Sequence, residues 1–351
     1  MGHIQIGQRQ IGPGRQVYVV AELSANHRQK FENAVRLVEL ARQCGADAVK
    51  LQTYTPDTIT LNSDGERFRV GGGTVWDGRT LFDLYTEAYT PWEWQPKLKQ
   101  LADDLGLDLF SSPFDNSAVD FLEAMEVAAY KVASCELVDL PLIERMARTG
   151  KPLIISTGMA TLEEIEEAVA AAERAGAKQI ALLKCTTAYP ADPREMNLRT
   201  IPELANRFQI PVGLSDHSLS TTVPVAAVAL GANLIEKHLT LSRSMNGPDD
   251  NFSLEPEEFK VMVDTVRLTE RALGEVQFGP TESEKNSRRF RRSLFVVENI
   301  RRGDTFDENN VRSIRPGDGL HTRYLSDVVG RSASQDIERG TPLSWDLVVK
   351  S

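Results

Sequence analysis

Short apolar runs alternate with amphipathic stretches between about residues 16 and 273. Each run has six to eight residues and is rich in Val, Ile and Leu, as buried strands of a parallel sheet are. Eight such runs occur, the number that a (β/α)8 barrel requires. They cover residues 16–23, 46–53, 107–112, 128–134, 152–158, 180–186, 210–216 and 233–240. The alternation therefore predicts an α/β fold of the TIM-barrel class.

The stretches between these runs carry apolar residues at helical spacing. Two of them also show helix start signals: a capping box at Thr161 and Glu164, and an N-cap at Thr90 before Pro91 and Glu93. A doubly wound sheet is the competing arrangement, but no GxGxxG motif occurs, which favours the barrel. The segment from Thr53 to Thr90 is long for a loop, which predicts a functional lid, with a decorated surface loop as the alternative.

The alternation stops after Gly274. We expect three parts: a barrel domain at residues 1–274, a polar linker at 275–292 that ends in the basic run KNSRRFRR, and a small turn-rich domain at 293–351. A domain this small is only marginally stable by itself, so we expect it to pack against the barrel of its own chain or of a partner.

Charge and composition narrow the possible partners. The formal net charge is -10 and the basic residues are dispersed, which argues against nucleic acid. Three cysteines without a CxxC motif suit a reducing cytoplasm rather than a disulfide framework. No apolar stretch approaches the ~20 residues that span a membrane, and MGHIQIGQRQ lacks a signal-peptide segment. We therefore expect a cytoplasmic protein with no membrane partner.

Every predicted strand ends in polar or ionisable residues, and a barrel places its catalytic groups at those ends. The residues are Glu22, Lys50, Gln52, Ser111, Ser112, Lys131, Ser134, Glu136, Ser156, Thr157, Lys184, Thr186, Thr187, Ser215, Asp216, His217, Glu236 and His238. For any single residue a helix cap or loop hydrogen bond is an equal alternative, but eight such endings together predict a polar pocket.

His217 and His238 end adjacent strands, so they are candidates to share one divalent metal, and two imidazoles suit Mn²⁺, Co²⁺ or Zn²⁺. The alternative is a pair of core or capping histidines. Lys50 and Lys131, with the nearby hydroxyl groups, suit a small phosphorylated acid, unless the lysines reach solvent or pair with a helix acid. Glu22 and Glu136 are acid/base candidates. A salt bridge to a lysine is the equal alternative for Glu136.

The chain resembles the sialic acid synthase family over nearly its whole length. The barrel segments that carry the resemblance are AELSANH, ADAVKLQTYTPDTIT, SSPFD, AYKVAS, PLIISTGMA, LKCTTAYP, GLSDHS, IEKHLTL and GPDDNFSLEP. The segments RSLFVVENIRRGDTF and VRSIRPGDGLH resemble its small C-terminal antifreeze-like (SAF, β-clip) domain. The segment TVWDGRTLFDLYTEAYTPWEW resembles the branch of the family that makes pseudaminic acid.

The resemblance implies condensation of phosphoenolpyruvate with an amino-sugar aldehyde and gives each site residue a role. Phosphoenolpyruvate would be held by Lys50, Ser112, Lys131, Ser134, Ser156, Thr187 and Ser215. The metal on His217 and His238 would be Mn²⁺, with Mg²⁺ or Co²⁺ as alternatives. The sugar would face Gln52, Glu136, Tyr189 and Asp249. Arg315 would reach a partner's barrel, which implies a domain-exchanged homodimer.

The acceptor expected from the resemblance is a 2,4-diacetamido-2,4,6-trideoxy hexose, whose apolar carbon would meet the region of Trp76 and Tyr85. N-acetylneuraminate or legionaminic acid synthesis is the near alternative. A metal aldolase that uses pyruvate and a non-enzymatic sugar-binding protein are the distant ones.

Overall fold

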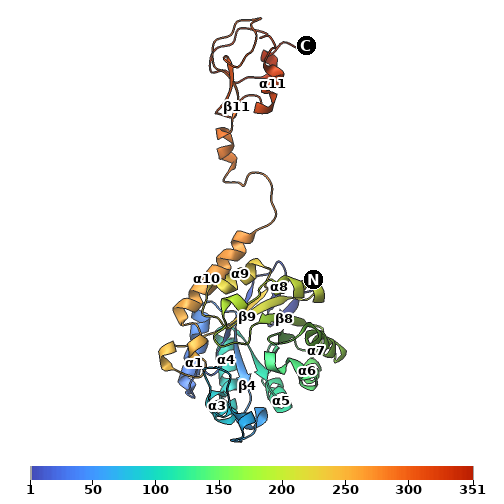
Figure 1. The fold of residues 1–351 in the computed structure, drawn as a ribbon, viewed down its shortest axis with the longest axis vertical. Coiled ribbons are helices and arrows are strands. Elements are labelled where there is room, and N and C mark those ends of the chain that lie inside the picture. Colours follow the sequence, from blue (N-terminus) through green and yellow to red (C-terminus); the bar gives the residue numbers. More distant parts are fainter. Residues whose placement is uncertain (1, 351) are drawn as a thin grey trace. The chain divides into compact units, whose positions relative to one another are not determined.

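Eight parallel strands form a closed barrel in the computed structural model, which describes residues 2–350 (Figure 1). Each strand pairs with the next, and the last pairs with the first, so all eight predicted runs are confirmed as strands. The strands are β3 (Tyr18–Glu22), β4 (Ala48–Thr53), β5 (Asp108–Pro113), β6 (Tyr130–Val132), β7 (Leu153–Ser156), β8 (Ile180–Cys185), β9 (Val212–Asp216) and β10 (Leu234–His238).

Helices follow the strands and surround the barrel (Figure 1). Thr161 caps α7 in the predicted capping box with Glu164. The predicted start at Thr90 is wrong: α4 begins at Gln95, and the Thr90 hydroxyl instead lies 3.1 Å from Nε2 of His27. The helices are α1 (Phe31–Gln43), α4 (Gln95–Asp104), α5 (Asn116–Ala124), α6 (Leu140–Ala147), α7 (Leu162–Arg174), α8 (Thr200–Phe208), α9 (Thr222–Ala229) and α10 (Pro256–Leu273).

An N-terminal hairpin that the sequence analysis missed closes one end of the barrel. It comprises β1 (Ile4–Ile6) and β2 (Arg9–Ile11). Its three isoleucines are buried with Tyr18 and Phe110, whose side chains fill the interior. Because strand side chains alternate, the same strands present a second apolar face to the helices. The opposite end of the barrel, where the strands finish, is left for the site.

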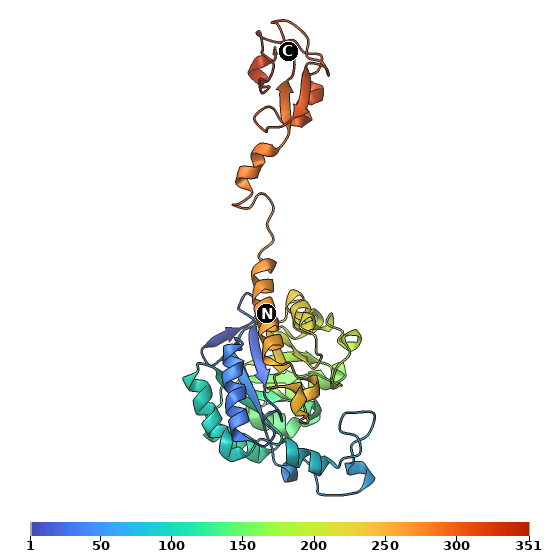
Figure 2. The ribbon, with the colours of Figure 1, turned by 90° about the vertical axis from the view of Figure 1, so that its left-hand side faces the viewer.

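The segment between β4 and α4 contains structure of its own. It includes α2 (Pro56–Ile59) and α3 (Leu81–Ala88), and an isolated bridge joins Arg69 to Thr80. Figure 2 shows it projecting from the barrel away from the N-terminal hairpin. Its position at the carboxyl ends of the strands fits the predicted lid.

The described residues divide into two compact units between Gly274 and Glu275. The second unit pairs β11 (Ser293–Val296) with β12 (Val311–Ile314), adds the short helix α11 (Leu325–Val328), and buries its own apolar cluster. Gly319 is required here, since a Cβ would lie 2.2 Å from the Leu294 carbonyl oxygen. Among the described residues, no helix is long and apolar enough to cross a membrane.

Candidate active site

A cavity of about 380 Å³ opens where the barrel strands end. Side chains two apart on a strand share a face, so Lys50 with Gln52, and Glu236 with His238, point into it. The cavity confirms the predicted convergence of the strand ends. The predicted residues that line it are Lys50, Gln52, Trp76, Tyr85, Lys131, Ser134, Glu136, Ser156, Thr187, Tyr189, Ser215, His217, Glu236, His238 and Asp249.

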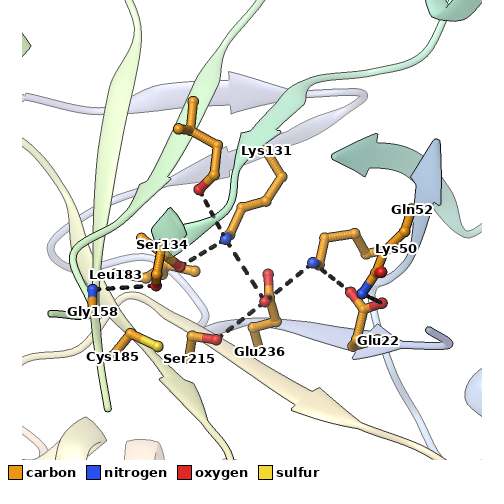
Figure 3. Close-up of polar contacts among 12 residues, drawn as sticks. Glu22, Lys50, Gln52, Lys131, Ser134, Gly158, Leu183, Cys185, Ser215 and Glu236 are labelled. Atoms are coloured by element: carbon orange, nitrogen blue, oxygen red, sulfur yellow. Dashed lines mark hydrogen bonds and ion pairs between the residues drawn. The ribbon is translucent and has the colours of Figure 1, made fainter. Parts of the chain in front are cut away.

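A chain of buried charges forms the base of this cavity (Figure 3). Lys50 Nζ lies 2.5 Å from a Glu22 carboxylate oxygen and 3.4 Å from Glu236 Oε1. The same Glu236 oxygen lies 3.9 Å from Lys131 Nζ and accepts a hydrogen bond from Ser215 Oγ at 3.1 Å. Lys131 also donates to Ser156 Oγ at 2.7 Å. Glu236 therefore holds two ammonium groups around one carboxylate.

The two lysines differ in how well they are paired. Burial works against the charged form of Lys50, yet Glu22 and Glu236 outweigh it and raise the pKa of this ammonium group. Burial lowers the pKa of Lys131, and the more distant Glu236 only partly offsets it. An incoming anion would therefore stabilise the charged form of Lys131 more than that of Lys50.

The two glutamate candidates also differ. Burial raises the pKa of Glu136 to about 7, against the effects of its backbone hydrogen bond and Lys131. Its buried Oε2 has no hydrogen-bond partner within residues 2–350. Burial likewise raises the pKa of Glu22, but Glu22 is held by Lys50 and accepts from the Ser24 N–H at 2.9 Å. Glu136 is the carboxyl group better placed to exchange a proton.

The predicted histidine pair is adjacent, with ring centroids 5.3 Å apart. Nδ1 of His217 lies 3.0 Å from the Thr186 carbonyl oxygen, so this nitrogen carries the proton and Nε2 is free to bind a metal. Nδ1 of His238 is buried with no partner among the described residues. Burial and the neighbouring His217 lower the pKa of His238, which keeps its ring neutral. Two unprotonated nitrogens in one cavity fit a divalent metal.

Two further features bear on whether the histidine pair could hold a metal. No group of three or more His, Cys, Asp and Glu side chains is arranged as metal ligands in the part of the chain that the structure describes. Burial lowers the pKa of His217, but contact with the Cys185 thiol raises it overall. A proton would compete with the metal for this ring.

The remaining wall of the cavity is apolar and comes mainly from the segment between β4 and α4. Trp76 donates from Nε1 to the Pro248 carbonyl oxygen at 2.9 Å, next to Asp249. Its ring lies 5.6 Å from that of Tyr189, which in turn lies 4.4 Å from His217. The apolar lining residues are Ile59, Val70, Leu81, Leu84, Ala88 and Phe114.

Some residues fall outside these expectations. Ser112 and Glu22 are buried beside the cavity rather than in its lining, and Arg315 belongs to the second unit. Lys184 is not part of the lining, whereas Cys185 is. The alternation of side chains along β8 could have identified Cys185 as a lining residue, because Cys185 and Thr187 are two apart and share a face. The sequence pattern identifies Glu236 only as a strand end, although its spacing of two from His238 marks it as inward-facing.

Comparisons with known proteins agree with this architecture. The model of the NeuB family matches residues 37–278, and that of the SAF domain matches residues 291–349. A pseudaminic acid synthase of Campylobacter jejuni is 44% identical over 97% of this chain and 98% of its own length. An N,N'-diacetyllegionaminic acid synthase of Legionella pneumophila is 34% identical over 96% of both chains.

A solved structure supports the same assignment. The spore coat polysaccharide biosynthesis protein SpsE of Bacillus subtilis matches with a TM-score of 0.68 and 33% identity, covering all of both chains. The family model spans more than half of the sequence, and the relatives match across barrel and C-terminal domain alike. The chain belongs to the NeuB family, with a TIM barrel followed by a SAF domain.

Proposed function

We propose that this chain is a pseudaminic acid synthase, a transferase that forms a carbon–carbon bond. It would condense phosphoenolpyruvate with 2,4-diacetamido-2,4,6-trideoxy-L-altrose and water to give pseudaminic acid and phosphate. The observation that carries the proposal is the cavity itself, whose lining combines two buried ammonium groups around Glu236, an apolar wall and two histidines. The 44% identity to a pseudaminic acid synthase supports the choice of branch.

Phosphoenolpyruvate would bind at the base of the cavity. Lys131, which is the less well paired lysine, would receive one anionic group, and Lys50 would contribute the second cation. The buried Oγ of Ser112 lacks a partner among the described side chains and backbone, so this hydroxyl could donate a hydrogen bond to the bound anion. The other proposed contacts are Ser134, Ser156, Thr187 and Ser215.

His217 and His238 would hold a divalent cation, for which we propose Mn²⁺, with Mg²⁺ or Co²⁺ as alternatives. When bound, such an ion polarises a carbonyl oxygen as a Lewis acid. Gln52, Tyr189 and Asp249 would orient the open-chain sugar so that its aldehyde carbon faces the phosphoenolpyruvate carbon that becomes nucleophilic.

The reaction balances without a further reagent. C3 of phosphoenolpyruvate bonds to C1 of the aldehyde, and the aldehyde oxygen takes up a proton. Water adds to the cationic C2 and gives up a proton to Glu136, whose free Oε2 is the available acceptor. Phosphate then leaves by cleavage of the C2–O bond. Reaction in ¹⁸O water should therefore yield phosphate without ¹⁸O, and labelled phosphate would contradict this bond cleavage.

The acceptor distinguishes this proposal from its near relatives. The apolar wall favours a sugar with a methyl group in place of a hydroxyl, because an unpaired hydroxyl there would lose its hydrogen bonds to water. The test measures phosphate release at matched phosphoenolpyruvate with the altro-configured diacetamido sugar, N-acetylmannosamine and the legionaminic acid precursor. The first should give the highest kcat/KM. Preference for either other sugar would assign the chain to N-acetylneuraminate or legionaminic acid synthesis.

The distant alternatives are separated by the same assay. A pyruvate-dependent aldolase would release no phosphate, and a sugar-binding protein would turn over nothing. Removal of metal by a chelator should abolish phosphate release, and added Mn²⁺ should restore it.

We also propose a cytoplasmic homodimer in which Arg315 of one copy completes the barrel site of the other. The test mixes two inactive variants, Arg315→Ala and His238→Ala. A mixed dimer pairs the intact barrel of the first with the intact SAF domain of the second, so activity should return. If Arg315 serves its own barrel, mixing restores nothing.

A further inference from the structure

Lys237 and Asp216 form an ion pair directly behind the two histidines. Their charged atoms are 2.6 Å apart, and both side chains are completely buried. The strand register pairs Lys237 with Asp216, and Glu236 with Ser215. Because side chains alternate along a strand, Glu236 and Ser215 face the cavity whereas the ion pair faces the surrounding helices. The pair is therefore outside the cavity and touches no substrate.

The contacts of this pair hold the chain on both sides of His217. The Lys237 ammonium group also donates to the Ser218 carbonyl oxygen and, at 3.4 Å, to that of Ser220. The second carboxylate oxygen of Asp216 accepts from the Ser218 N–H at 2.8 Å. His217 lies between two residues that the pair fixes, so its backbone has little freedom to rotate.

The ion pair also restrains His238, because Lys237 is its neighbour in β10. Lys237 immediately precedes His238 at the end of β10, and its ammonium group ties that end to the loop after β9. One ion pair thus couples the backbones that carry both imidazoles. Residues behind metal ligands commonly set ligand orientation in this way.

Stability alone does not account for two buried charges here. Removing them from water is costly, and replacing such a pair with apolar residues of similar volume is often neutral or stabilising. We propose that Lys237 and Asp216 are positioning residues that hold His217 and His238 at the separation and orientation a divalent cation needs. This inference rests on the metal role in the proposed function.

The decisive experiment measures the binding of Mn²⁺ to the double variant Asp216→Leu/Lys237→Met. Electron paramagnetic resonance detects the Mn²⁺ that stays free and so gives the Kd. The double variant removes both charges, so we expect it to fold with a Tm near wild type while its Kd for Mn²⁺ rises by about 10–100-fold. A double variant with wild-type Kd overturns the inference and leaves the metal role intact. A wild-type protein that binds no Mn²⁺ removes the metal role and the inference together.

The matched control breaks an ion pair at the other end of the barrel. Arg267 Nη2 lies 2.7 Å from Asp47 Oδ2, and Arg267→Met should lower the Tm without changing the Kd for Mn²⁺. A Kd that rises as much in this control as in the double variant would attribute the effect to lost stability and overturn the inference.

If the double variant does not fold, hydrogen exchange of the wild-type protein with and without Mn²⁺ tests whether the ion pair orders the loop after β9. The loop after β9 should be equally protected with and without Mn²⁺, because the ion pair already orders it. Protection of the Ser218 and Ser220 amides that rises more than tenfold on adding Mn²⁺ would show that the metal orders the loop, and would overturn the inference.

Discussion

The two ends of the barrel differ in how their charged groups are partnered. At the N-terminal end, Arg9 pairs with Asp108 at 2.9 Å and with Asp47 at 3.5 Å, and Tyr18 donates to the same Asp108 at 2.9 Å. Arg9, Asp47 and Asp108 therefore all have charged partners. At the opposite end, buried oxygens of Glu136 and other residues have none within the described chain. We infer that the ion pairs of Arg9 support the fold, whereas the unpaired oxygen of Glu136 is available to a ligand.

Cavity size alone does not separate the two ends. A larger hollow of about 1100 Å³ lies at the N-terminal end, between the residues that precede β3 and helices α8, α9 and α10. It includes Arg267, which is already bound to Asp47. The smaller cavity is the candidate site because both of its lysines are deeply buried and one of them, Lys131, is only partly neutralised.

Glu136→Gln should give the largest loss of activity. We expect kcat to fall by about 10²–10⁴-fold, because the amide cannot accept a proton. The pKa of about 7 also predicts that wild-type kcat/KM rises as pH increases through 7, since Glu136 must be ionised to act as a base. The Gln variant should lose this inflection and Glu136→Asp should keep it. An inflection that persists in the Gln variant assigns the proton to another group.

Lys131→Met should lower kcat/KM for phosphoenolpyruvate by about 10²–10³-fold, because it removes a positive charge aimed at the bound anion. Glu236 remains paired with Lys50, so the variant should still fold. The comparison is Arg9→Met at the N-terminal end, which should lower Tm and leave kcat/KM unchanged. Equal effects of the two variants on activity would erase the distinction between the ends.

Trp76→Ala should raise the KM for the sugar by about tenfold and leave the KM for phosphoenolpyruvate unchanged, because the ring lies on the apolar wall. Trp76→Phe keeps an aromatic ring but loses the hydrogen bond to the Pro248 carbonyl, and its effect should be smaller. Steady-state kinetics with each substrate varied in turn measures both. An unchanged sugar KM in the Ala variant would remove Trp76 from the sugar site.

Tyr18→Phe should have the smallest effect. It removes one hydrogen bond to Asp108 and should lower the free energy of unfolding by about 1 kcal/mol, with no change in kcat. Denaturant unfolding measures the free energy of unfolding, and the phosphate-release assay measures kcat. A fall in kcat would show that the N-terminal end communicates with the site.

The sequence predicted the barrel because eight apolar runs and their helices are local patterns. It also predicted that Lys50, Lys131, His217 and His238 converge, since their strand-end positions place them at one mouth. It did not reveal the bridging role of Glu236, because that role depends on two lysines from other strands meeting one carboxylate. The N-terminal hairpin was also missed, since two three-residue strands carry too little periodicity.

Closure of the barrel joins its first strand to its last: β3 pairs with β10 from Tyr18 to Glu22. While the chain emerges from the ribosome, one edge of β3 therefore stays without a partner until β10 has been made. An open strand edge invites pairing with another chain. The half-synthesised barrel is thus exposed to aggregation, and slower translation or chaperone binding while the chain between these two strands is made should change the yield of folded protein.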